Sequence, residues 1–245
     1  MRRSPRIVGA VGISIATSVV GITALSGSAG ASSNAQTEYQ AALRTAGSQG
    51  VHYVSKASEQ GVTIDVIGDT GKTSGSQVLT VRKGSLTERV EVILVGSTGY
   101  LQGNAIALQN ILGLTAAQST TYANKWLSFP TANATLAQLV SGLRNKDVAT
   151  ELKMSGPYTS GGNKMIGNQT TQAIKGFVST STGSKVPVVL YVQSGSTPRP
   201  VEEVTNPGKA TTSIQGTVIF SNWGEKIHPT APAHSVSLIS LAPAG

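Results

Sequence analysis

Residues 51–96 read VHYVSKASEQGVTIDVIGDTGKTSGSQVLTVRKGSLTERVEVILVG, and the hydrophobic residues in this stretch recur with a period close to two. Val62, Ile64 and Val66 alternate with polar residues, which places the three aliphatic side chains on one face of a strand. Turns that contain Gly, Ser or Asp separate four such runs, as expected for sequential hairpins. The runs are residues 51–58, 62–68, 77–83 and 86–96. The stretch therefore predicts an antiparallel sheet with one covered face.

The same period returns after about residue 165. Val186, Val188, Leu190 and Val192 alternate on one face of a candidate strand. The candidate strands in this part are residues 172–179, 186–193, 199–204 and 211–221. No fixed repeat and no linker rich in Pro or Gly separates the two β-rich parts, so we expect one large sheet in one domain.

Helical patterns precede and separate the β-rich parts. Residues 37–48 form one candidate helix, and residues 104–112 form another, with Leu108 and Leu112 on one side and Gly113 at its end. Further candidates are residues 115–122, residues 136–143 and a turn that ends near residue 152. Amphipathic helices need an apolar surface to cover, and the concave face of a curved sheet offers one. The order of elements predicts an α+β fold, a large curved antiparallel β-sheet with helices covering the concave face.

The amino terminus has the three parts of a signal peptide. Three arginines precede an apolar run at residues 7–25, and small residues follow as far as Ala31. We expect residues 1–31 to be a signal peptide that is cleaved after Ala31, and residues 32–245 to form a single exported domain. The alternative is an uncleaved anchor, because the apolar run is nearly long enough to span a bilayer.

The composition excludes several kinds of chemistry. The chain has no cysteine, so disulfides, thiolate nucleophiles, Cys-ligated zinc and a Cys-linked lipid are excluded. The net charge is +8, and removal of a signal peptide with three arginines and no acid leaves +5. The basic residues are scattered, which favours a solvated basic face, or attraction to an anionic envelope surface, over a nucleic-acid partner.

No motif predicts a cofactor or a metal site. Residues 68–73 (GDTGKT) lack the glycine spacing of a phosphate-binding loop and are expected to form a hairpin turn. His52, His228 and His234 have no partner at metal-ligand spacing, so we expect ordinary surface or core histidines.

The sequence also lacks the groups of an enzyme. A Gly-x-Ser-x-Gly nucleophile elbow is absent. Glu202 and Glu203 are adjacent, but neighbouring strand residues point to opposite faces and make a poor pair for acid and base catalysis. We therefore expect a binding protein rather than an enzyme, since an extracellular hydrolase would need a catalytic cluster that we do not find.

Several short phrases resemble the LolA-like envelope carriers, and the LppX and LprG branch of that superfamily in particular. The phrases are residues 100–104 (YLQGN), 125–130 (KWLSFP), 190–192 (LYV), 198–201 (PRPV) and 220–224 (FSNWG), together with Pro232. The resemblance covers most of the chain after the signal segment. It implies a half-barrel of antiparallel strands whose concave face, closed by helices, holds the acyl chains of lipids, lipoproteins or glycolipids.

The chain departs from that branch in one respect. Relatives of the LppX and LprG type are usually tethered by a lipidated cysteine, and residues 28–34 contain none. The resemblance therefore implies a secreted or envelope-associated protein without a lipid anchor. The expected partners are a lipid or acylated ligand and, transiently, a membrane surface or envelope lipoproteins.

We predict an apolar pocket between the sheet and the helices. Its expected lining is Val62, Ile64, Val66, Val188 and Leu190 from strands, with Ile106, Leu108 and Leu112 from the covering helix. Trp126 and Trp223 are expected either at the mouth of this pocket or in the core. The alternative function is a structural or protein-interaction module of the envelope whose helices fill the concave face, in which case the same residues are ordinary core.

Overall fold

The computed structural model describes residues 29–179, 183–207 and 215–241, and nearly half of them lie in β-strands. The strands of the amino-terminal half are β1 (Val51–Glu59), β2 (Val62–Thr70), β3 (Ser74–Lys83), β4 (Leu86–Val95), β5 (Thr98–Gly103) and β6 (Leu127–Pro130). Those of the carboxyl-terminal half are β7 (Ser155–Ile166), β8 (Gln169–Ser179), β9 (Lys185–Gln193), β10 (Arg199–Thr205), β11 (Gln215–Ser221) and β12 (Val236–Ser237). The predicted signal peptide lies outside the described residues except for residues 29–31.

Short helices connect or precede the strands. They are α1 (Ala29–Ser48), α2 (Ala105–Leu112), α3 (Ala116–Tyr122), α4 (Ala134–Ala137) and α5 (Asn145–Glu151), with the 3₁₀ turns η1 (Gln138–Val140) and η2 (Leu238–Leu241). α2 begins where the Asn104 side chain accepts the Ala107 N–H at 3.1 Å. It ends at Gly113, whose left-handed φ of 68° closes the last turn. These caps explain why the predicted bounds of α2 are correct to within one residue.

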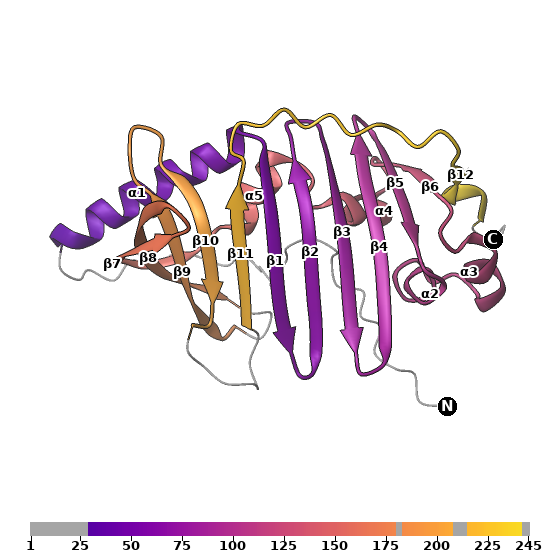
Figure 1. Ribbon diagram of the computed structural model, residues 1–245, viewed down its shortest axis with the longest axis horizontal. Helices are drawn as coiled ribbons and strands as arrows, with labels where there is room; N and C mark the ends of the chain where they lie inside the picture. Colours follow the sequence, from indigo (N-terminus) through magenta and orange to yellow (C-terminus); the bar gives the residue numbers. More distant parts are fainter. Residues whose placement is uncertain (1–28, 180–182, 208–214, 242–245) are drawn as a thin grey trace.

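The described strands form one 12-stranded sheet in the order β12-β6-β5-β4-β3-β2-β1-β11-β10-β9-β8-β7. Consecutive strands make two antiparallel meanders, and β11 returns to pair with β1, which joins the meanders in the centre of the sheet (Figure 1). Among the strands of the described ranges, β12 alone pairs in parallel, with β6. The predicted fold, an α+β half-barrel with a large curved antiparallel sheet, is confirmed.

The connection from β6 to β7 crosses the concave face. β7 is one end of the strand order and β6 is next to the other end, so the chain has to traverse nearly the whole sheet between them. α4, η1 and α5 form this crossing and lie behind the strands in Figure 1. At its middle, Arg144 forms an isolated bridge with Gly71, and the Asn145 N–H donates to the Gly71 carbonyl at 2.9 Å. These backbone contacts hold the start of α5 against the end of β2.

Two clusters of buried hydrophobic residues form the core. The first lies between α1, α5 and the central and carboxyl-terminal strands, and includes Tyr53, Leu190 and Phe220. The second lies between α2, η1 and strands β4 to β6, and includes Leu108 and Phe129. α1 therefore covers one half of the concave face, and α2 covers the other half.

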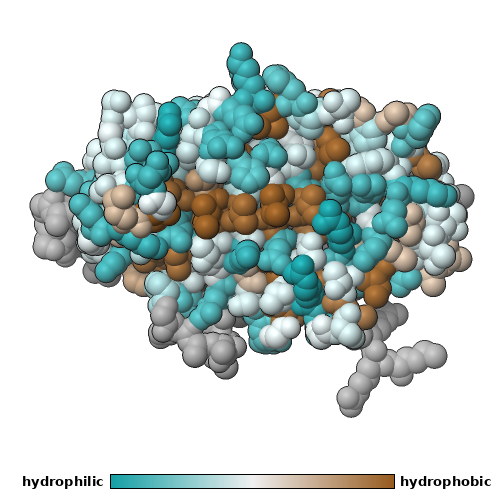
Figure 2. All heavy atoms as spheres, viewed as in Figure 1, coloured by the Kyte–Doolittle hydropathy of each residue, from teal (hydrophilic) through white to brown (hydrophobic). Residues whose placement is uncertain are grey.

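The outer face of the sheet carries an apolar band (Figure 2). Strand register places Ile219, Val54, Ile67 and Val78 side by side across four neighbouring strands. Ile67 is 52 % exposed and Ile219 is 45 % exposed. Ile67 lies on the face opposite Val66, so the alternation predicted for residues 62–66 continues and places an aliphatic side chain on the outer face.

The structure corrects three predictions about secondary structure. The helix predicted at residues 136–143 is wrong: the segment contains only η1 and the last residues of α4, and Gly142 then adopts a φ of 84°. Its apolar residues are nevertheless buried in the second cluster. β7 was not predicted before Met165, because most of this edge strand is exposed and its register is interrupted twice. No helix or strand is predicted after residue 221, yet the tail ends in β12 and η2.

The close approach of the crossing segment, residues 131–154, to the sheet can be tested at Gly75. A Cβ at this position would lie 2.3 Å from the Leu143 carbonyl oxygen and 2.7 Å from that of Asp69. Because both are backbone atoms, neither can rotate away. We expect Gly75→Ala to lower the free energy of unfolding by about 2 kcal/mol in urea denaturation. Gly162→Ala is the control, because nothing lies within 4 Å of its added Cβ, and equal stability of the two variants would contradict the packing described here.

Candidate functional site

A row of buried side chains crosses the concave face at the level of α5. Strand register places the following residues in one line: Val90, Leu79, Val66, Ser55, Val218, Glu203, Leu190 and Ile174. We call this line the middle row. Neighbouring strands are about 4.8 Å apart, so the row is roughly 30 Å long. Each member is at most 8 % exposed, and only Ser55 and Glu203 are polar.

The α5 segment lies directly on the middle row. Val148, Glu151 and Leu152 face Val218, Phe220 and Glu203 across a cavity of about 10 Å³. A cavity of this size holds at most one water molecule. At α5 the helical layer and the sheet are therefore in contact, and no wide pocket separates the lining residues.

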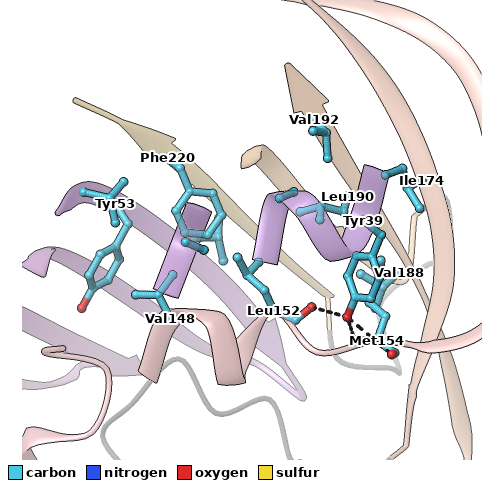
Figure 3. Packing of buried hydrophobic residues seen from close by; sticks show 14 of the residues in the cluster. Tyr39, Tyr53, Val148, Leu152, Met154, Ile174, Val188, Leu190, Val192 and Phe220 are labelled. Carbon is cyan, nitrogen blue, oxygen red and sulfur yellow. Dashed lines mark hydrogen bonds between the residues drawn. The ribbon is translucent and has the colours of Figure 1, made fainter. Parts of the chain in front are cut away.

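Tyr39 connects α1 to the end of the crossing segment (Figure 3). Its hydroxyl donates to the Leu152 carbonyl at 3.1 Å and accepts the Met154 N–H at 2.6 Å. The Tyr158 hydroxyl also donates to the Met154 carbonyl, at 2.7 Å, and its ring lies 4.8 Å from that of Tyr39. Burial raises the pKa of both tyrosines, so both hydroxyls keep their protons. The end of α5 is therefore held by side-chain bonds, whereas its start is held by backbone bonds.

The residues predicted to line one pocket lie in different parts of the molecule. Val66, Val188 and Leu190 belong to the first cluster, to which α1 and α5 also contribute. On the face that Val66 shares, Val62 is half-buried and Ile64 is 37 % exposed near the open end of the β2–β3 pair.

The predicted residues from α2 lie in the other half of the molecule. Leu108 is fully buried in the second cluster, Leu112 packs against that cluster, and Ile106 is half-buried. The helix that covers Val66 and Leu190 is thus α5 together with α1, not α2. Ligand contact by any of these residues stays a prediction.

Glu203 was missed as a site residue. It lies between Val218 and Leu190 in the middle row and is 8 % exposed. Burial raises the pKa of its carboxyl to about 8, and the nearby carboxylate of Glu151 adds to the rise. The carboxyl is therefore mainly protonated at neutral pH. The signal was present in the sequence, because alternation along β10 places Glu203 on the same face as buried Val201 and Thr205.

Glu202 has the opposite environment. Its carboxylate accepts a hydrogen bond from the Lys164 ammonium at 2.7 Å on the outer side of the sheet. The expectation that Glu202 and Glu203 point to opposite faces is confirmed.

The two tryptophans have different surroundings. Trp126 lines a surface hollow of about 480 Å³ beside β6 and β12, together with Lys125 and His234. This hollow lies at one end of the sheet, away from α5. Trp223 packs against the first cluster, and its indole N–H donates to the Pro200 carbonyl at 2.8 Å. Trp223 therefore belongs to the core, and Trp126 to a hollow at the sheet edge.

The remaining candidate features are His52, possible metal ligands and possible membrane-spanning helices. His52 lies 2.7 Å from a carboxylate oxygen of Asp69, on the outer face. Within the described part of the chain, no group of three or more His, Cys, Asp or Glu side chains is arranged to hold a metal ion. None of the helices in the described ranges is both long and apolar enough to cross a bilayer.

The fold places the chain among proteins with an open, curved antiparallel sheet whose concave face carries helices. The structure of LprF from Mycobacterium bovis aligns with 83 % of this chain and 99 % of its own, at a TM-score of 0.57 and 15 % identity. Lipoprotein LppX from Mycobacterium tuberculosis aligns with 80 % of this chain and 98 % of its own, at a TM-score of 0.46 and 14 % identity. A LolA superfamily protein from Nitrosomonas europaea covers 80 % of this chain and 94 % of its own, at a TM-score of 0.31 and 10 % identity.

No family model and no curated protein matches the sequence. The likeness to LprF at 15 % identity shows a shared fold. It confirms the half-barrel fold that the sequence resemblance implied.

The pKa of Glu203 predicts how stability depends on pH. The folded protein keeps a proton that the unfolded chain releases above the ordinary value of 4.5, so the free energy of unfolding falls as the pH rises from 4.5 to about 8. Glu203→Gln is uncharged at every pH, and we expect it to match the native protein near pH 4 and to be more stable at pH 9. Since one pKa unit corresponds to about 1.4 kcal/mol, the gain should reach several kcal/mol.

Urea denaturation at several pH values measures this difference. Glu202→Gln is the matched control, because its ion pair is exposed on one side and is worth at most about 1 kcal/mol. A difference between native protein and Glu203→Gln that does not change with pH would contradict the prediction.

Proposed function

We propose that the chain is an exported binding or carrier protein that holds a lipid or acylated ligand against the concave face of its sheet. The observation that carries this proposal is the middle row, a nearly continuous apolar surface covered by short helical segments rather than by a second sheet. The fold shared with LprF and the resemblance to the LolA-like carriers support the same function.

Ligand entry requires the α5 segment to move, because the cavity beneath it is only about 10 Å³. α5 has seven residues, too few for a helix that is stable in isolation. Its position therefore depends on its contacts with Gly71 at one end and Tyr39 at the other. Movement of α5 would uncover Val218, Phe220 and Glu203, which line the cavity beneath it.

The apolar surface under α5 is sufficient for useful affinity. Each buried methylene gains about 0.8 kcal/mol, so ten methylenes gain about 8 kcal/mol. This free energy corresponds to roughly micromolar affinity before the cost of ordering the ligand is subtracted. An acyl chain would thus bind without a catalytic or metal centre, as a carrier rather than a substrate site.

The proposal includes export. Residues 1–31 would act as a signal peptide, and the remaining chain would work outside the cytoplasm without a lipid anchor. Transient contact with a membrane surface or with envelope lipoproteins would load and unload the ligand.

A second candidate function is a structural or protein-interaction module of the envelope. The close packing of α5 on the middle row favours it, because a permanently filled concave face leaves no room for a ligand. The two functions differ in whether α5 leaves the sheet.

Native mass spectrometry tests the proposal directly. The exported protein, purified from its own host without detergent, should carry a mass above that of the polypeptide, and organic extraction should release an acyl compound. Hydrogen exchange should then show faster exchange of the α5 amides in the loaded protein, because the ligand displaces this segment. α2 is the internal control, since it packs in the second cluster.

Two results together would favour the filled module instead. One is a bare polypeptide mass in the native protein. The other is unchanged exchange in α5 after incubation with phospholipid vesicles.

A further inference from the structure

The apolar band on the outer face of the sheet is an unoccupied surface. Its members lie side by side on β11, β1, β2 and β3, and they are Ile219, Val54, Ile67 and Val78. Figure 2 shows the band in brown across the centre of this face, and no described helix crosses it in that view. Ile67 and Ile219 are about half exposed. Exposed apolar patches of this kind mark interaction surfaces.

Charged residues flank the band on both sides. On one side, Lys56 of β1 lies opposite Asp65 of β2. On the other side, His52 of β1 lies opposite Asp69 of β2, and their side chains are 2.7 Å apart. A membrane of anionic lipid would favour a surface of one positive sign, whereas neighbouring residues of both signs match a protein surface with the reverse arrangement.

A second copy of the same face supplies the reverse arrangement. When two outer faces meet, a two-fold axis that runs parallel to the strands between β1 and β2 exchanges these strands between the copies. Lys56 then faces Asp65 of the second copy, and His52 faces Asp69 of the second copy. Each contact occurs twice, as an interface with two-fold symmetry requires.

The same axis brings the two apolar bands together. Val54 meets Ile67 of the second copy, and Ile219 meets Val78 of the second copy. Two sheets that face each other with strands nearly aligned pack in this way through interdigitating side chains. The interface would therefore have an apolar centre and a charged rim, which is the usual arrangement in protein interfaces.

The ends of the band limit the size of this interface. Glu202 follows the band on β10 and Glu91 follows it on β4. Glu202 accepts a hydrogen bond from Lys164 at 2.7 Å, so this neutralised end does not repel Glu91 of the second copy. Four strands at about 4.8 Å and roughly 20 Å of strand length bury about 400 Å² on each copy. Because this is about half of a standard interface, the association would be weak.

We propose that the chain forms a weak, reversible dimer through the outer face of its sheet, with the apolar band at the centre of the interface. The inference does not depend on the proposed function, since the concave face lies on the other side of the sheet. It assigns the partner of the band as a second copy of this chain.

Sedimentation equilibrium of the exported protein tests the dimer. Over about 5 to 500 µM the apparent mass should rise towards twice that of the monomer. Ile67→Glu places a charge at the centre of the band and should weaken the association at least about tenfold. Leu86→Glu is the control, because Leu86 is equally exposed but lies at the β3–β4 turn. Native protein that stays monomeric, or Ile67→Glu that associates like native protein, would overturn the proposal.

Charge exchange tests the position of the two-fold axis. Lys56→Asp and Asp65→Lys should each dimerise less well than native protein, because like charges then meet across the axis. An equal mixture of the two variants should associate at least about as tightly as native protein, since opposite charges meet again in the mixed dimer. A structural effect within one chain cannot be restored by mixing, and a mixture that associates no better than its components contradicts the axis and the proposal.

A control mixture and a membrane assay complete the test. Lys175→Asp mixed with Glu59→Lys carries similar charge changes on exposed residues outside the band, and equal complementation there would mean unspecific attraction and would overturn the proposal. Vesicles with anionic phospholipid test the other occupant. Native protein that stays monomeric but co-sediments with vesicles, while Ile67→Glu does not, would assign the band to a membrane surface instead.

Discussion

The position of β6 and β7 in the sheet is the constraint on which the rest of the structure depends. Residues 131–154 connect these strands across nearly the whole strand order, a path of roughly 45 Å at about 4.8 Å per strand. A single α-helix of this length would reach only about 36 Å. The crossing must therefore include non-helical backbone, and it does so at residues 141–144 between η1 and α5, where Ser141 and Arg144 are extended and Gly142 has a φ of 84°. Short helices separated by extended residues are a consequence of the distance to be covered.

The same constraint determines how the concave face is covered. A broken crossing segment cannot form a continuous hydrophobic stripe, so its two helical parts contribute to different clusters: Val140 to the second and Val148 to the first. Between them the backbone bridges to Gly71 and lies so close to Gly75 that an added Cβ there would be 2.3 Å from the Leu143 carbonyl oxygen. Beyond α5, the bonds from Tyr39 to Leu152 and Met154 return the chain to the sheet. Coverage of the sheet is therefore local and anchored at separate points.

The sequence predicted the elements whose pattern is local. β1 to β4 and β8 to β10 alternate between buried and exposed positions, and their predicted bounds lie within a few residues of the observed ones. The exposed edge strand β7 has no such alternation, and the crossing segment has apolar spacing that reflects burial without a continuous helix.

The candidate site was only partly predictable, because membership of the middle row depends on the pairing of β1 with β11, which joins residues more than 150 positions apart. Glu203 was within reach of sequence reasoning, since its inward position follows from its neighbours in β10.

The buried carboxyl of Glu203 bears on the balance between a closed and an open concave face. In the closed arrangement Glu203 is desolvated next to Glu151, and this cost is borne only while α5 lies on the sheet. Any arrangement that brings water or a polar ligand group to Glu203 removes the cost. The closed state is therefore less stable than its apolar contacts alone would make it. A ligand that binds only the open state would then need less affinity to shift the equilibrium from closed to open. Replacement of a buried ionisable group by an aliphatic residue of similar size often stabilises a core, so the glutamate at this position is a cost that the proposed opening of the concave face would relieve.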